Sequence, residues 1–237
     1  DTCIRKVSQD RLQRLKGEPL YLSAIGSRRE GVGTMRTMER SPVQERFQHL
    51  LAVIGSQRFL KKEGLGNEVP FFICPFKPEE SVEMGRVQRQ LINKLTQAVG
   101  VRVLEINLYD LSIKLLKQRK VWDRILQTEP DVTKEQLKEL LQGLLDSQNH
   151  LIPAIAEEMK TVDFDVLFIT GVGEVFPYIR SHNVLNNLQS TAKDKPTVMF
   201  FPGEYTHSLQ DGASLDLFGR LHDDKYYRAF NIFHCEV

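Results

Sequence analysis

Phe164 to Leu188 read Phe-Asp-Val-Leu-Phe-Ile-Thr-Gly-Val-Gly-Glu-Val-Phe-Pro-Tyr-Ile-Arg-Ser-His-Asn-Val-Leu-Asn-Asn-Leu, and this stretch decides the fold. Its apolar run, Val166 to Ile169, is continuous, which is typical of a strand buried on both faces of a parallel sheet. The glycines of Thr170-Gly171-Val172-Gly173 allow a turn that brings backbone close to a ligand or another segment. Pro177 suits the first turn of a helix, and apolar side chains then recur at helical spacing. The stretch therefore predicts strand, glycine turn and helix.

The glycine turn lacks the spacing of a nucleotide-binding loop. A P-loop needs Gly-Lys-Ser/Thr after its first glycine, and this triplet occurs nowhere in the chain. A dinucleotide fingerprint ends in Gly or Ala, where this chain has Phe176, and Glu174 puts negative charge where a pyrophosphate would sit. We interpret the turn as a tight strand-to-helix connection, with a nucleotide site as the alternative.

Further apolar runs predict the other strands of the same sheet. These runs are Val69 to Phe76, Val101 to Leu108, Pro196 to Phe201 and Ala229 to Phe233. Helical patterns separate them, so the chain predicts an α/β fold with roughly five strands, mostly parallel and flanked by helices. Pro202-Gly203 is expected to end its strand, and residues 212–218 are expected to form a short helix or loop.

Two polar motifs predict helix starts. Thr133-Lys134-Glu135-Gln136 fits a capping box. Asn107 and Asp110 follow the second predicted strand, where they either line a site or cap the next helix, and capping is the commoner role.

Composition describes an ordinary globular chain of 237 residues, with 41% hydrophobic and 27% charged residues. No apolar run is long enough to cross a bilayer, and no signal peptide is visible. Three separated cysteines, Cys3, Cys74 and Cys235, indicate neither a zinc site nor a disulfide framework. These features make the reducing cytoplasm the expected location.

Charge divides the chain into two parts. Residues 1–37 hold eight Lys or Arg and four Asp or Glu, so the net charge of +1 leaves −3 for residues 38–237. We expect 1–37 to be a poorly ordered basic segment that precedes a natural start at Met38, with a basic arm for phosphate or an acidic partner as the alternative. Residues 38–237 are expected to form one α/β domain, and their mild acidity argues against direct nucleic-acid contact.

Four polar clusters are candidates for chemistry. They are Glu174 with Arg180 to Asn183, Glu204 with Tyr205 and His207, His222-Asp223-Asp224, and Asn107 with Asp110. Glu174 and Glu204 follow successive strands, so carboxylates at the strand ends could hold magnesium in a phosphodiesterase or nuclease. No recognised spacing supports that chemistry, and no Gly-x-Ser-x-Gly elbow indicates a serine hydrolase.

The predicted helix after the glycine turn has an amide-rich polar face. Asn183, Asn186 and Asn187 lie on it, although asparagine is a modest helix former. Such a face favours either contacts with a partner or internal hydrogen bonds to neighbouring loops, and both interpretations remain open.

Four stretches carry a family resemblance: Phe72-Ile-Cys-Pro-Phe, Leu104-Glu-Ile-Asn-Leu-Tyr-Asp-Leu, Thr170 through Leu188, and Phe200-Phe-Pro-Gly-Glu-Tyr. They resemble the BrxB family of BREX, the bacteriophage exclusion systems of bacteria and archaea. The resemblance covers roughly Met38 to Val237. It implies the alternation of strands and helices seen in P-loop proteins, without their Walker motifs.

The resemblance also implies a function. The protein is expected to be a non-catalytic subunit without a cofactor. It is expected to bind a PglZ-type alkaline-phosphatase-like partner of the same defence operon, and other BREX components are further possible partners. The alternative is a metal-dependent phosphodiesterase or nuclease, or a nucleotide-binding enzyme. The expected interaction surface comprises Gly171, Gly173, Glu174, Tyr178, Arg180, His182, Asn183, Asn186, Asn187, Glu204, Tyr205 and His207.

Overall fold

The computed structural model describes residues 38–63, 70–208, 212–219, 221–224 and 229–236. For residues 207–208, 212–213 and 221–224 it describes the backbone alone. The predicted basic segment 1–37 therefore lies outside the described residues. Within the described part, no helix is both long and apolar enough to cross a membrane.

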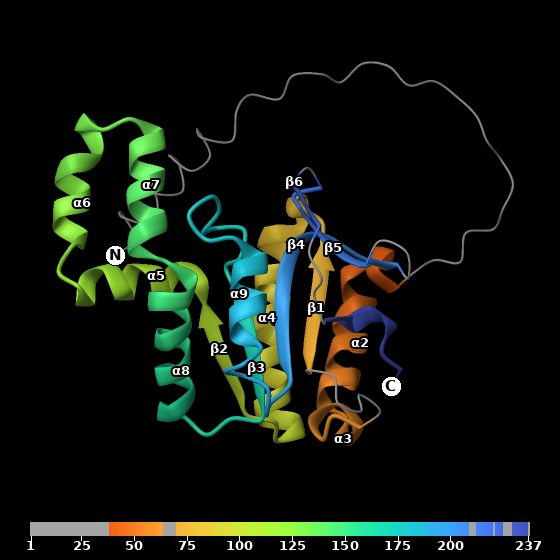
Figure 1. The fold of residues 1–237 in the computed structure, drawn as a ribbon. Helices are drawn as coiled ribbons and strands as arrows, with labels where there is room; N and C mark the ends of the chain where they lie inside the picture. The colour runs from red at the N-terminus through yellow and green to blue at the C-terminus, as the bar shows by residue number, and fades with distance from the viewer. Residues whose placement is uncertain (1–37, 64–69, 209–211, 220, 225–228, 237) are drawn as a thin grey trace, which may run out of the picture. The chain divides into compact units, whose positions relative to one another are not determined.

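Five parallel strands form the centre of the sheet, in the order β2-β3-β4-β1-β7 (Figure 1). They are β1 (Phe71–Phe76), β2 (Val103–Asn107), β3 (Val166–Thr170), β4 (Thr197–Ser208) and β7 (Phe230–Asn231). The α/β fold and the mostly parallel sheet are thus confirmed. β3 and β1 are buried along their whole length, as their continuous apolar runs predict.

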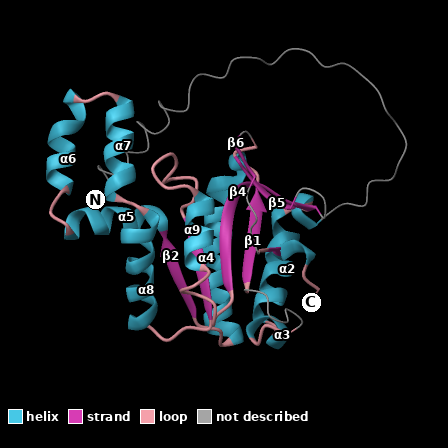
Figure 2. Ribbon diagram, in the orientation of Figure 1, coloured by secondary structure: helices cyan, strands magenta, loops and turns pink. Residues whose placement is uncertain are grey.

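Helices cover both faces of this sheet (Figure 2). One face packs on α2 (Val43–Gly55) and α4 (Ser81–Lys94), which the π-helical turn η3 (Leu95–Val99) extends. The other face packs on α5 (Leu108–Gln118), α8 (Ile152–Thr161) and α9 (Ser181–Leu188). Alternate residues of each strand point to opposite faces: Ile73 joins one hydrophobic cluster, and Phe72 and Cys74 join the other.

The chain also contains other helices and helical turns. They are η1 (Met38–Arg40), α3 (Gln57–Leu60), η2 (Pro78–Glu80), α6 (Trp122–Thr128), η4 (Glu129–Asp131), α7 (Lys134–Leu144), η5 (Ser147–Leu151) and η6 (Ile232–His234). Both predicted caps are confirmed: Thr133 and Gln136 form the capping box of α7, and Asn107 Oδ1 accepts hydrogen bonds from the N–H groups of Tyr109 and Asp110 at the start of α5.

The predicted end of β4 at Pro202-Gly203 is wrong. β4 continues to Ser208 and pairs in antiparallel fashion with β5 (Gly212–Leu217), which pairs with β6 (Leu221–Asp224). The expected short helix or loop at 212–218 is therefore mostly a strand. The reason is a close backbone approach, because a Cβ on Gly203 would lie 2.1 Å from the carbonyl oxygen of Asp216.

The predicted helix start at Pro177 is also wrong, since α9 begins at Ser181. Residues before it form turns, in which the N–H groups of Tyr178 and Ile179 donate to the carbonyl of Val175. The Pro177 carbonyl accepts a hydrogen bond from Gln142 Nε2 of α7 at 3.1 Å. The last strand is likewise shorter than predicted, because Asn231 Oδ1 caps η6 through the N–H of Phe233.

Candidate functional site: the carboxyl edge of the sheet

The carboxyl ends of β2, β3, β4 and β1 lie at one edge of the sheet (Figure 1). β4 lies between β3, which leads to α9 on one face, and β1, which leads to α4 on the other. Ligand sites of open α/β sheets form where neighbouring connections diverge in this way. The carboxyl edge is therefore the place where a ligand site of this domain is expected.

The hairpin formed by the end of β4 and by β5 packs at the carboxyl edge. The N–H of Phe218 donates to the Pro202 carbonyl at 2.9 Å, and the ring of Phe218 lies edge-on to Phe176, with centroids 6.1 Å apart. Leu215 and Leu217 of β5 belong to the same hydrophobic cluster as Val172 and Val175 of the glycine turn. The hairpin thus packs against the loop that follows β3.

Protein side chains occupy the space beside both glycines of the predicted turn. A Cβ on Gly171, whose φ is +72°, would lie 2.5 Å from Asn107 Oδ1. A Cβ on Gly173 would lie 2.8 Å from Pro202 Cγ. The two glycines therefore serve close packing between neighbouring segments, in agreement with a tight strand-to-helix connection.

The exposed members of the predicted surface are polar. Glu174 and Arg180 are exposed in the turns before α9, and Asn183 and Asn186 are exposed on α9 itself. Asn187 is half-buried, and its Nδ2 donates to the Asn183 carbonyl at 2.7 Å. This segment therefore presents one acidic, one basic and two amide side chains to solvent.

Three other residues of the predicted surface are buried or half-buried. His182 is 4% exposed and Tyr205 is 7% exposed, so neither side chain contributes to an accessible face. The Tyr205 hydroxyl donates to the Ala229 carbonyl at 2.6 Å, and burial raises the pKa of this phenol to about 12. Tyr178 is half-buried, and burial together with nearby Glu129 raises its pKa.

The hairpin brings together two of the sequence clusters. Glu204 is exposed and lies directly opposite Asp216 of β5, which in turn lies opposite His222 of β6. His207 lies opposite Ala213 in the same ladder, and its side chain is outside the description. Among side chains that the structure describes, no group of three or more His, Cys, Asp or Glu is placed to hold a metal ion.

Sequence reasoning missed the buried Arg46 of α2. Its side chain is 2% exposed, and its Nη2 donates to Glu80 Oε2 at 2.8 Å, beside the carboxyl end of β1. Arg46 Nε has no hydrogen-bond partner among the described residues. The sequence contains a sign of this burial, because Arg46 falls four residues before Leu50 on the apolar face of the helix.

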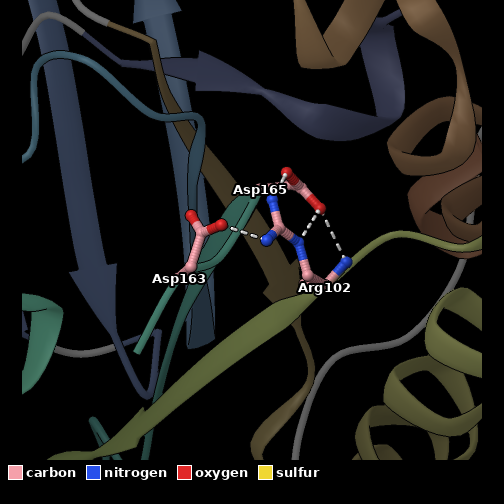
Figure 3. Close-up of polar contacts among 3 residues, drawn as sticks. All are labelled: Arg102, Asp163 and Asp165. Carbon is pink, nitrogen blue, oxygen red and sulfur yellow. Dashed lines mark hydrogen bonds and ion pairs between the residues drawn. The ribbon is translucent and has the colours of Figure 1, made fainter. Parts of the chain in front are cut away.

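Sequence reasoning also missed an ion cluster at the opposite edge (Figure 3). Arg102, just before β2, binds Asp163 through Nη1 and Asp165 through Nη2 and Nε, the latter two at 2.7 and 3.0 Å. The hydrogen bonds from Arg102 lower the pKa of Asp165 to about 2, and those to Asp165 and Asp163 raise the pKa of Arg102. The Asp165 N–H also donates to the Arg102 carbonyl at 2.8 Å, so the cluster aligns the starts of β2 and β3.

Comparison with known proteins identifies the family. Residues 104–232 match the family model described as BREX protein BrxB. A BREX protein BrxB of Bacillus cereus (strain H3081.97) is 32% identical over 198 residues, which cover 80% of this chain and 97% of the relative. The chain belongs to the BrxB family.

A second BrxB protein, from Escherichia coli O9:H4 (strain HS), is 30% identical over 192 residues, 81% of this chain and 92% of the relative. No solved structure matches this chain. The family resemblance of the sequence is thus confirmed, and this BrxB family member belongs to the BREX phage-defence systems.

Proposed function

We propose that this BrxB protein is a non-catalytic interaction subunit of a BREX defence complex and that it binds the PglZ-type protein of its operon. One observation carries the proposal: the β4–β5 hairpin packs where an α/β sheet normally opens a ligand crevice. Among the described residues of the carboxyl edge, the hairpin covers the turn after β3, and exposed polar side chains form an outer surface. Such a surface suits a folded partner better than a small substrate.

The partner surface comprises the exposed Glu174, Arg180, Asn183, Asn186 and Glu204. Carboxylate, guanidinium and neutral amide side chains together suit a specific, polar interface rather than a nonspecific one. The surface has a rigid support, because α9 buries Val184, Leu185 and Leu188 and Gln142 of α7 holds the preceding loop. In this proposal the protein acts in the cytoplasm, where the operon's other products are made.

Co-purification tests the proposal. The tagged full chain is co-expressed with the PglZ-type protein of the same operon and run on a size-exclusion column. We expect co-elution at fixed stoichiometry, which Arg180→Glu and Glu204→Lys each abolish without lowering the melting temperature. Two matched reversals, Lys61→Glu and Glu63→Lys, change exposed side chains in the turn directly after α3 and should leave the complex intact. α3 lies at the end of the sheet opposite the hairpin of β5 and β6 (Figure 1). Separate elution of the unmodified proteins would refute the proposal.

The alternative function is a metal-dependent phosphodiesterase or nuclease, or a nucleotide-binding enzyme. The cross-strand pair of Glu204 and Asp216 is the observation that favours it, because carboxylate groups bind divalent cations. A ligand that binds only the native state must raise the melting temperature. A panel of MgCl2, MnCl2, ATP and GTP measures this directly, and a concentration-dependent rise that Glu204→Gln removes would favour the enzyme.

A further inference from the structure

The outer face of α4 is basic, although residues 38–237 together carry a net negative charge. Residues 84–104 contain four basic side chains, Arg86, Arg89, Lys94 and Arg102, and no acidic one. Asp163 and Asp165 bind Arg102, but the other three form no ion pair with a carboxylate of the described residues. α4 therefore carries three cations and one carboxylate, Glu83, a net charge of +2.

The three charges lie on one accessible stripe. Arg86, Arg89 and Lys94 are all exposed, while Met84, Val87 and Leu91 point into the core. The exposed Gln90 and Asn93 fall between the charges on the same side of the helix. With a rise of about 1.5 Å per residue, the charges from Arg86 to Lys94 span about 12 Å. The stripe, here called the α4 face, is thus a compact set of cations and amides.

An exposed valine lies at the start of the α4 face. Val82, in the first turn of α4, is 73% exposed, and it precedes Arg86 by four residues and Arg89 by seven, so it lies on the same side of the helix. Interfaces between proteins combine arginine with apolar contacts, whereas the backbone of a nucleic acid offers phosphates to cations and little to an exposed valine. The combination favours a protein partner.

We infer that the α4 face is a second docking surface, which takes an acidic amphipathic segment of a partner protein. Carboxylates of the segment would pair with Arg86, Arg89 and Lys94, and an apolar side chain near one of its ends would cover Val82. Glu83 lies at one end of the face and would repel a segment whose charges extend too far toward the start of α4. α4 and α9 lie on opposite faces of the sheet, so this surface is separate from the one proposed for the PglZ-type protein (Figure 2).

Two designed peptides test the inference with the full chain. The acidic probe is a fluorescein-labelled helical peptide of about 20 residues, with five glutamates on one face and a leucine near one end. The neutral probe has glutamine in place of each glutamate, and a labelled 20-base-pair DNA duplex serves as the polyanion control. Fluorescence anisotropy at low and high salt measures all three affinities.

We expect the acidic peptide to bind at least tenfold more tightly than the neutral peptide, and more weakly as salt screens the charges. Arg86→Glu with Arg89→Glu should abolish this binding, and Arg86→Gln with Arg89→Gln should weaken it by a smaller factor. Arg124→Glu with Lys134→Glu, a matched double reversal on α6 and α7, should leave it unchanged. Circular dichroism checks that each variant keeps the fold.

Three results would overturn the inference. They are equal binding of acidic and neutral peptides, retained binding in the Arg86→Glu, Arg89→Glu variant, and tighter binding of the duplex than of the acidic peptide. Because the probes contain no BREX protein, the outcome is independent of co-purification with the PglZ-type protein. Failure of one proposal therefore leaves the other standing.

Discussion

The side chain of Asn107 occupies the space that a Cβ on Gly171 would need. The distance from that Cβ position to Asn107 Oδ1 would be 2.5 Å, and the same oxygen accepts the N–H groups of Tyr109 and Asp110. One amide thus caps α5 and sets the closest approach of the turn after β3. The carboxyl ends of β2 and β3 are joined through this contact.

Gly171→Ala tests that relationship. Alanine at a φ of +72° is strained, and its methyl group would displace the Asn107 side chain from the cap. We expect the free energy of unfolding to fall by about 2–3 kcal/mol, measured by urea denaturation. Gly143→Ala is the control: it lies in α7 with nothing within 4 Å of its Cβ position, so it should stabilise by about 0.5–1 kcal/mol. Equal midpoints for Gly171→Ala and the unmodified protein would refute the packing role.

The Arg46–Glu80 pair should respond asymmetrically to removal of its partners. Glu80→Gln leaves the guanidinium of Arg46 buried without a countercharge, and we expect a loss of about 2–3 kcal/mol because Glu80 itself is partly exposed. Arg46→Met fills the same space with an apolar chain, and we expect a change within about 1 kcal/mol. Chemical denaturation of both single variants and the double variant measures the coupling. A larger loss for Arg46→Met than for Glu80→Gln would contradict this account.

The Arg102–Asp165 contact predicts acid sensitivity. The native pKa of Asp165 is about 2, below its ordinary 3.8, so the unfolded state binds the proton first. The contribution to stability is complete above about pH 4 and is lost as the pH falls toward 2. Since Arg102 is half-exposed, we expect the effect to be a few degrees of melting temperature. Asp165→Asn should show a shallower decline between pH 5 and 2.5 than the unmodified protein, and parallel curves would exclude the contact as the cause.

Tyr205 predicts the opposite dependence at alkaline pH. Burial raises its native pKa to about 12, so the unfolded state loses the phenolic proton first, and stability falls as the pH rises from about 10 toward 12. Tyr205→Phe also removes the hydrogen bond to the Ala229 carbonyl, at a cost of about 1–1.5 kcal/mol at pH 7. Denaturation at pH 7 and pH 10.5 should show a smaller alkaline loss in Tyr205→Phe. An unchanged alkaline loss would assign the titration to another group.

Glu204→Lys should separate folding from binding. Glu204 lies directly opposite Asp216, and like charges in that position disfavour strand pairing. Lysine at this position would face Asp216 with the opposite charge. The free energy of unfolding should therefore stay equal or rise by up to about 1 kcal/mol, and the melting temperature should not fall. The same variant should lose the PglZ-type partner in co-purification. A variant that unfolds, or one that keeps both stability and partner, would remove Glu204 from the proposed surface.

Local patterns anticipated much of this architecture. The apolar runs of β1 and β3, the capping box at Thr133 and the cap at Asn107 were all readable from neighbouring residues, because strand burial and helix capping depend on side chains within a few positions of one another. The glycine turn was readable as a turn, but the reasons for its glycines were not. Asn107 and Pro202 supply those reasons, and they are distant in sequence.

The sequence by itself therefore determined the fold class, the parallel strands and the BrxB family. Only the tertiary structure decided that β4 continues through Pro202-Gly203, that Tyr205 and His182 are buried, and that Glu204 meets Asp216. Each of these depends on a contact between segments that are separate in the chain, such as the approach of the Asp216 carbonyl to Gly203. Local pattern and propensity do not specify such contacts, because the partner's position is set by how the whole sheet and its helices pack.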